Sequence, residues 1–432
     1  MAIPVLDLVG NRVSCAIGIW EAVAFGSARR RGHSAPPRII AIRNNLLSRR
    51  IWVGKARWNA MRRVGDRRGI AEEGSEIEFW NSSGVYWSKK IEIRTNETVG
   101  EWKIGDGSQW PRLAAHDLAW SRALRDGLHH KSFDLTAHDT EGGVIGYLPL
   151  TFVKSWLFGK FLVSQPYLNT GGVWADDEAV SRSLVDRAVA LADELDVKHL
   201  ELRHEKPLEH GKLSRSRTDK VHMRLTLPES SEALMKSFKS KLRSQVKKTF
   251  EHPFELQWGQ DDVLQEFYAV FARNMRDLGT PVYSQQLFRS ILRAFPRSSE
   301  LCVVRLQGSV VAGALLLHER GRTEVPSASC LREFNSTGAN MWMYWQLLQR
   351  AIERGSQEFD FGRSSIDSGT YKFKEQWGAI PHPAHWQYFV RSGAPEDMRP
   401  TSPKRQRLIH AWQKMPVWLT RCIGPSIVRG IP

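Results

Sequence analysis

The segment from Phe359 to Gly378, FDFGRSSIDSGTYKFKEQWG, combines residue types that could do chemistry on a negatively charged substrate. Its pattern predicts a strand at Phe359–Phe361, a polar loop through residues 364–367, and a short cationic segment after Gly369. Backbone amides at a strand end, together with Arg and Lys side chains, suit a phosphate, a carboxylate or the oxyanion of an acyl transfer. The same pattern also fits an ordinary strand and turn with a solvated cluster of charges.

The charge of the chain is the strongest signal in its composition. The 432 residues, enough for two or three domains, carry a formal net charge of +16. Residues 1–74 contain 14 Lys plus Arg against 5 Asp plus Glu, so +9 of this charge lies there. A basic balance favours polyanionic partners such as nucleic acid, anionic lipid or phosphorylated substrates, without choosing among them.

Cysteine and histidine spacing argues against a metal or disulfide framework. The cysteines are far apart and form no CxxC pair, which also favours a reducing compartment; they are Cys15, Cys302, Cys330 and Cys422. His199, His204 and His222 have no paired ligands at metal spacing, so packing or surface roles are expected. No stretch resembles a membrane span or a signal peptide. A soluble, cytoplasmic protein without metal or other cofactor is therefore predicted.

Four sections of the chain are predicted from periodicity and charge. Residues 1–90 form a basic extension, expected to be irregular, with short apolar runs between arginine pairs. Residues 91–227 show strands alternating with helices, which is typical of an α/β domain. Residues 228–395 form a second such domain. Residues 396–432 form a basic amphipathic tail, expected to dock on the body, with peripheral contact to the inner membrane as the alternative.

A basic helix is predicted to begin at Ser230, because apolar residues then recur every four positions. Its other faces hold six cations within thirteen residues and no acid after Glu232. Solvated helix faces usually mix signs, so this surface is predicted to contact a polyanion such as tRNA. The residues assigned to that contact are Lys239, Lys241, Arg243, Lys247 and Lys248.

The second half shows two helices, three strands, a helix and a strand, which is the element order of the GNAT acyltransferase fold. Six ordered segments resemble FemAB-type proteins, the tandem-GNAT aminoacyltransferases, and particularly the FemAB-related proteins of exosortase/PEP-CTERM and exopolysaccharide systems. The segments are GYLPLTFVKSWLFGKFLVSQPYLNTGGV (Gly146–Val173), HLELRH (His199–His204), KSKLRSQVKK (Lys239–Lys248), ARNMRDLGTPVYS (Ala272–Ser284), MYWQLLQRAIERG (Met343–Gly355) and FDFGRSSIDSGTYKFKEQWGA (Phe359–Ala379).

This resemblance implies an α/β fold with two tandem GNAT-like domains and mixed sheets. It also implies transfer of an aminoacyl group from aminoacyl-tRNA to the amine of a cell-envelope precursor, related to peptidoglycan or exopolysaccharide. The family's Phe-Lys-x-x-Phe-Gly pattern is present as Phe373–Gly378, with Trp377 replacing the second Phe. By resemblance, Lys374 would stabilise negative charge as the acyl ester is attacked.

Lys374, Asp360 and Tyr371 are the expected catalytic residues. Asp360 would orient the incoming amine, and Tyr371 with Arg363 would position a phosphate or carboxylate of the substrate. No general base is obvious, which is compatible with an amine attacking an activated ester. Further substrate contacts are expected from Ser364, Gly369, Thr370, Phe373, Trp377, Lys154, Arg203 and Tyr344.

One absence bears on the acyl donor. GNAT enzymes that use acyl-CoA carry a Gln/Arg-x-x-Gly-x-Gly/Ala loop, whose backbone amides bind the pyrophosphate. The corresponding stretch, Cys330–Ala339, has a single glycine, so aminoacyl-tRNA is favoured. Two alternatives stay open. One is an acyl-CoA-dependent acetyltransferase acting on an exopolysaccharide sugar, and the other is a non-catalytic GNAT pair that binds RNA or glycan.

Overall fold

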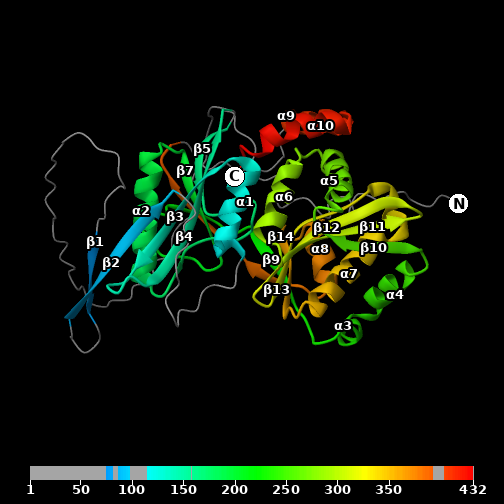
Figure 1. Cartoon of the computed structure of the whole chain (residues 1–432), viewed down its shortest axis with the longest axis horizontal. Coiled ribbons are helices and arrows are strands. Elements are labelled where there is room, and N and C mark those ends of the chain that lie inside the picture. Colours follow the sequence, from blue (N-terminus) through cyan, green and yellow to red (C-terminus); the bar gives the residue numbers. More distant parts are fainter. Residues whose placement is uncertain (1–73, 81–85, 98–113, 157, 393–402, 432) are drawn as a thin grey trace, which may run out of the picture. The chain divides into compact units, whose positions relative to one another are not determined.

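The computed structural model in Figure 1 describes residues 74–80, 86–97, 114–156, 158–392 and 403–431. All of these residues belong to one compact unit. The predicted basic extension lies outside the described residues up to position 73. From there on, β1 (Gly74–Trp80) and β2 (Tyr86–Asn96) are paired strands, so sheet structure begins before the predicted domain start at residue 91.

The first sheet has the order β1-β2-β3-β4-β5-β7-β16-β8, with β6 paired to β4. It is mixed, because β5 and β7 run parallel whereas their neighbours are antiparallel. Its further elements are β3 (Lys131–His138), β4 (Val144–Ser155), β5 (Gly159–Val163), β6 (Trp174–Ala175), β7 (His199–His204), β8 (Arg215–Arg217) and β16 (His385–Val390), with helices α1 (Leu118–Leu128) and α2 (Glu178–Glu194).

The second sheet has the order β10-β11-β12-β13-β14-β9-β15 and is also mixed. Its strands are β9 (Lys220–Thr226), β10 (Phe254–Gly259), β11 (Ser299–Leu306), β12 (Ser309–Glu319), β13 (Arg322–Cys330), β14 (Glu358–Ser365) and β15 (Ile380–Pro383). The accompanying helices are α3 (Ser231–Ser237), α4 (Ser240–Thr249), α5 (Leu264–Leu278), α6 (Gln285–Ala294), α7 (Ala339–Glu353) and α8 (Gly369–Gln376). This order confirms the predicted succession of helices and strands.

Side-chain caps fix where several helices begin. Asp177 accepts a hydrogen bond from a backbone amide three residues on and starts α2. Ser230 and Ser284 start α3 and α6 in the same way. Such a cap stabilises a helix by about 1 kcal/mol. The single helix expected after Ser230 is in fact two, because Phe238 takes an extended backbone conformation and α4 begins after it.

Two strands lie in the sheet opposite to the one that their predicted domain forms. β9, which precedes the predicted boundary at residues 227/228, lies between β14 and β15 in the second sheet. β16, which comes long after that boundary in the sequence, lies between β7 and β8 in the first sheet. The domain boundary at residues 227/228 therefore stays a prediction, because each sheet contains one strand from the other side of it.

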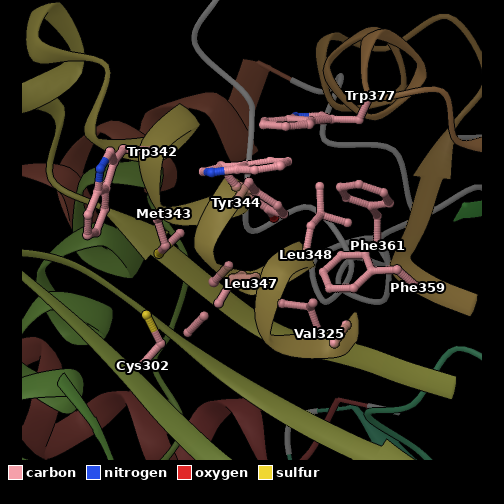
Figure 2. Packing of buried hydrophobic residues seen from close by; sticks show 14 of the residues in the cluster. Cys302, Val325, Trp342, Met343, Tyr344, Leu347, Leu348, Phe359, Phe361 and Trp377 are labelled. Atoms are coloured by element: carbon pink, nitrogen blue, oxygen red, sulfur yellow. The ribbon is translucent and has the colours of Figure 1, made fainter. Parts of the chain in front are cut away.

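Two apolar cores flank the second sheet. One lies under α3, α4, α7 and α8 and includes Phe359 of β14 (Figure 2). The other lies under α1, α5 and α6 and includes Leu301 of β11. Because successive strand residues alternate between faces, Asp360 of β14 and His222 and Arg224 of β9 lie on the face opposite the first core. This polar part of the sheet contains the candidate site.

The basic tail forms two helices, α9 (Pro403–Lys414) and α10 (Val417–Val428), which dock on α5. The buried Trp412 indole donates to the Thr280 carbonyl oxygen at 3.2 Å, and Arg276 of α5 donates to the Met415 carbonyl oxygen at 3.0 Å. The predicted docking is thereby confirmed. Among the described residues, none of the helices has the length and apolarity needed to span a bilayer.

Candidate functional site

Strand β14 and helix α8 frame the segment singled out in the sequence. The strand continues to Ser365, so Ser364 and Ser365 lie in a strand rather than in the predicted loop. The reason is a bulge at Gly362, whose φ of +77° glycine adopts at low cost. Beyond this bulge β14 continues to pair with β9, and α8 then begins at Gly369.

β13 and β14 run parallel only at the start of β14. Residues 322–324 pair with residues 358–360, whereas beyond Gly362 β14 stays paired with β9, its neighbour on both sides of the bulge, and no longer with β13. The two strands therefore separate at the bulge. Groups on either side of the separation can reach a substrate that approaches the strand ends.

Lys374 and Asp360 hold this bulge from two sides. The buried Lys374 ammonium donates to the carbonyl oxygens of Gly362 and Arg363 at 3.0 and 2.9 Å. The Asp360 carboxylate accepts from the Gly362 amide at 2.7 Å and from Arg224 Nε at 3.0 Å. The structure thus brings three predicted site residues, Lys374, Asp360 and Arg363, to one turn of backbone.

Buried charges continue from Asp360 across the polar face of the sheet. Arg224 binds Asp360 and also Glu205, which lies just after β7 of the first sheet. Burial alone would raise the pKa of Asp360, but attraction from Arg224 outweighs it and lowers that pKa below the usual range. Asp360 is therefore a carboxylate at neutral pH, held by Arg224, which sequence reasoning missed.

Glu324 of β13 is the second acid at the point where the strands separate. It lies directly opposite Asp360 in the parallel register. Burial and repulsion from Asp360 raise the pKa of Glu324 to about 7. A carboxyl group with such a pKa can accept and release a proton near neutral pH. No general base is evident in the sequence alone, and Glu324 is the group in the described site that fits that role.

The raised pKa of Glu324 predicts a pH-dependent stability. Its folded-state pKa lies above its unfolded value, so its stabilising contribution is complete below the unfolded pKa and is lost as pH rises through about 7. Glu324→Gln stays neutral throughout. The variant is therefore expected to gain in melting temperature over the wild type at about pH 8 and to gain less at about pH 5. An equal shift at both pH values, measured by thermal unfolding, would contradict the assignment.

Two buried arginines meet at Trp386, where the two sheets adjoin. The guanidinium carbons of Arg203 from β7 and Arg363 from β14 each lie 4.1 Å from the Trp386 ring centroid. Arg203 also binds Glu201 at 2.7 Å and the Leu168 carbonyl oxygen at 2.7 Å. The arrangement joins two predicted substrate contacts from different halves of the chain, and it adds Trp386, which the sequence did not single out.

Several buried polar atoms near this junction have no hydrogen-bond partner among the described residues. They are Tyr283 Oη, Ser364 Oγ, His204 Nε2 and both ring nitrogens of His222. Burial raises the pKa of Tyr283, an effect that Arg203 and Arg363 oppose, so its hydroxyl lies within their electrostatic reach. Buried polar atoms require hydrogen bonds, so this set suits a polar, anionic ligand. Tyr283 lies in the motif ARNMRDLGTPVYS, a signal that could have identified it.

His222 is placed to keep this region neutral rather than cationic. It lies opposite Arg363 on one side and His382 on the other in the strand register. Burial lowers its pKa to about 4, with Arg224 contributing in the same direction against the attraction of Asp360. The imidazole is therefore uncharged at neutral pH and can donate or accept one hydrogen bond at each nitrogen.

The aromatic residues predicted to bind substrate form part of the core instead of a surface. Tyr344 of α7 lies 5.6 Å from Phe361, 5.0 Å from Phe373 and 6.4 Å from Trp377, measured between ring centroids (Figure 2). Trp377 is completely buried. These rings hold α8 against the sheet, and any direct contact with substrate stays a prediction.

The remaining predicted residues occupy three places. At the start of α8, the buried Thr370 follows Gly369 and its hydroxyl lies 2.8 Å from that of the cap Ser368, with the half-buried Tyr371 next. Lys154 is exposed near the tip of the β4–β5 hairpin, opposite Lys160. On α4 the exposed cations are Lys239, Lys241, Lys247 and Lys248, whereas Arg243 is half-buried and donates to the Phe238 carbonyl oxygen.

Comparisons with known proteins agree with this architecture. Residues 236–375 match a family model described as an acetyltransferase (GNAT) domain. A crystal structure of FemX aligns with 14% identity and a TM-score of 0.50, covering 68% of this chain and 93% of that chain. The chain also aligns with L-PGS from Bacillus licheniformis at 12% identity and a TM-score of 0.45, covering 69% and 96% of the two chains.

A tandem GNAT protein from the clavulanic acid biosynthesis pathway aligns at 13% identity and a TM-score of 0.39, covering 67% of this chain and 92% of that chain. No curated protein matches the sequence. At these identities the likeness concerns the fold alone. The fold is α/β, with two tandem GNAT-like domains built on mixed sheets, as the sequence predicted.

Proposed function

We propose that this protein is an N-acyltransferase that forms an amide bond on a cell-envelope precursor, with aminoacyl-tRNA as the donor. The observation that carries the proposal is the bulge of β14, whose backbone binds a buried ammonium and one of two carboxyl groups that lie opposite each other. Lys374 supplies the positive charge at the bulge, Arg363 begins the strand beyond it, and Asp360 and Glu324 supply the acids. A cation that stabilises the oxyanion and an acid that takes up the amine proton both favour acyl transfer to an amine.

In the proposed reaction the amine nitrogen of the acceptor attacks the ester carbonyl carbon of the donor. Glu324 takes the proton that the amine loses, and Lys374 stabilises the negative charge that forms on the carbonyl oxygen. The new C–N bond forms as the C–O ester bond breaks, and the departing ribose oxygen of the tRNA recovers the proton. Arg203 and Arg363, with Tyr283, would bind a phosphate or carboxylate of the acceptor.

The segment before α7 supports tRNA over acyl-CoA as the donor. Residues Arg332–Thr337 form a 3-10 helix, and Gly338 follows in a left-handed conformation. The amides of Phe334 and Gly338 donate within this turn, to Leu331 and Asn335. Backbone amides that bond to their own turn are not arranged as a pyrophosphate cradle.

A binding comparison tests the donor. Purified protein is expected to bind charged tRNA with a strong dependence on salt, and Lys241→Glu is expected to weaken this binding. Lys414→Glu, an exposed lysine of α9, is the matched control and should leave tRNA binding unchanged. Binding is measured at two salt concentrations, side by side with acetyl-CoA.

Binding of acetyl-CoA without a preference for tRNA would overturn the donor assignment. It would favour a CoA-dependent acetyltransferase acting on an exopolysaccharide sugar, the reading suggested by the acetyltransferase family model over residues 236–375. Binding of tRNA without any transfer to an amine would favour a non-catalytic RNA-binding pair. Narrower assignments, to peptidoglycan or to an exosortase-associated exopolysaccharide, rest on the sequence resemblance, and a tRNA donor would place the protein in the cytoplasm.

A further inference from the structure

Four large apolar side chains are exposed to solvent on two segments that are distant in sequence. Trp156, at the tip of the β4–β5 hairpin, is 93% exposed, and Trp418 of α10 is 66% exposed. Leu408 of α9 and Ile423 of α10 are exposed as well. Single exposed apolar residues are ordinary, but two tryptophans that are each more than half exposed are not, because their burial elsewhere would stabilise the fold.

The hairpin tip and the tail helices meet in space. Gly430, just after α10, approaches Ser155 so closely that a Cβ on it would lie 2.5 Å from the Ser155 hydroxyl oxygen. The Tyr167 hydroxyl, from the loop after β5, donates to the Arg429 carbonyl oxygen at 3.2 Å. Trp156 therefore follows a residue that contacts the C-terminal end of α10, and both tail helices pack on α5.

The outward side of α10 is mostly apolar. Trp418 and Cys422 follow at helical spacing and are exposed, with Ile423 beside them, and the exposed Arg421 and Ser426 are its polar members. The inward side is fixed by Thr420 and by Gly424, where an added Cβ would lie 2.9 Å from the Val282 amide nitrogen. The apolar outward side is therefore a consequence of how the helix docks, because rotating α10 would break this close approach.

Both segments are cationic and contain no acid. Residues 403–431 carry six Lys plus Arg and no Asp or Glu, and residues 151–163 add two lysines and no acid. Among them, Lys154, Arg407 and Lys414 are exposed. We call the four apolar residues and these three cations the tail patch. Tryptophan anchors flanked by cations are typical of surfaces that bind the headgroup region of anionic bilayers.

We propose that the tail patch docks the protein on the surface of an anionic lipid bilayer, with Trp156 and Trp418 entering the headgroup region and the cations attracted to lipid phosphates. The occupant is a bilayer rather than a nucleic acid, because the paired regions of a folded RNA would use the cations but offer no unstacked base to either indole. This inference is independent of the proposed acyl transfer, since it rests on residues outside the candidate site.

The exposed thiol of Cys422 offers a direct probe. Among the described cysteines, Cys302 and Cys330 are buried and Cys422 is exposed. Replacing Cys15 by serine removes the fourth cysteine, so that a fluorophore is directed to Cys422. An environment-sensitive fluorophore on Cys422 is expected to shift to the blue when vesicles of phosphatidylcholine and phosphatidylglycerol are added. Vesicles of phosphatidylcholine alone should produce a much smaller shift, because the electrostatic attraction is missing.

The control probe is placed on the basic helix α4, at an exposed aromatic residue outside the tail patch. Phe250, at the end of α4, is 55% exposed, and Phe250→Cys in a Cys15→Ser, Cys422→Ser background accepts the same fluorophore. Its spectrum is expected to stay unchanged on vesicles. A shift at position 250 with none at 422 would place the lipid on α4 and overturn the proposal.

Vesicle co-sedimentation tests the contribution of the tryptophans to membrane binding separately from that of the basic helix α4. Trp156→Ser and Trp418→Ser are each expected to weaken binding about tenfold, and neither should unfold the protein because both side chains are exposed. Lys241→Glu, on α4, should leave vesicle binding unchanged. The proposal is contradicted if tRNA abolishes vesicle binding, Lys241→Glu weakens it and both tryptophan variants retain it, because that result would show a nucleic-acid surface. The absence of any vesicle binding would also contradict the proposal.

Discussion

Replacing Lys374 with alanine is expected to lower the turnover of amide formation by about 10²–10³-fold, the range found when a donor to a developing oxyanion is removed. The Lys374 ammonium is buried at the β14 bulge, where a charge is weakly screened and its effect on a nearby carbonyl is large. The measurement is a single-turnover rate with an aminoacyl donor and an amine acceptor under saturating conditions.

Because Lys374 also binds two backbone carbonyl oxygens, a structural role must be separated from a chemical one. Lys372→Ala, on the same helix but exposed, is the matched control and should retain turnover. The melting temperature of Lys374→Ala is recorded alongside. If its residual activity simply follows the fraction of folded protein, or if only KM changes, Lys374 orders the bulge and does not act on the reacting atoms.

The largest effect on stability is expected from Arg224→Met, which should lower the free energy of unfolding by about 3–5 kcal/mol at neutral pH. The substitution leaves the carboxylates of Asp360 and Glu205 without the guanidinium that both contact. Arg273→Met is the control. Its ion pair with Glu333 is exposed on both sides, and its loss should cost about 1 kcal/mol or less.

The loss of stability in Arg224→Met is expected to depend on pH in one direction. In the wild type the pKa of Asp360 is lowered, so the stability it contributes is present above its unfolded pKa and is lost on acidification. Without Arg224 that contribution is already missing at neutral pH. The difference between variant and wild type, measured by urea unfolding, is therefore expected to narrow as the pH falls below about 4, through the lowered pKa of Asp360. A constant difference would show that Arg224 acts through packing alone.

Local patterns in the sequence predicted most elements of the fold. The helix start at Ser230 and the strand at Phe359–Phe361 depend on neighbours in sequence and were interpreted correctly. The insertions of β9 and β16 into the opposite sheets were missed, because strand pairing between distant segments leaves no trace in local periodicity. The break at Phe238 was missed because its apolar spacing is continuous across α3 and α4.

The candidate site was predictable only in part, for the same reason. Lys374, Asp360 and Arg363 belong to one short segment, so the motif found them together. Arg224 and Glu324 act through neighbours on other strands, and nothing in their own segments indicates the pairing with Asp360. The raised pKa of Glu324 is a property of the assembled sheet, which single-sequence reasoning does not contain.

The position of β16 has a consequence for how this architecture can change over generations. The second sheet is built from one continuous stretch of the chain, β9 to β15, whereas the first sheet contains β16, which is encoded after the whole second sheet. A recombination event that replaced the chain up to residue 219 would therefore pair a new β7 and a new β8 with the old β16. These three strands must be inherited together, and chimeras with a relative should fold only when the crossover points lie outside residues 199–390.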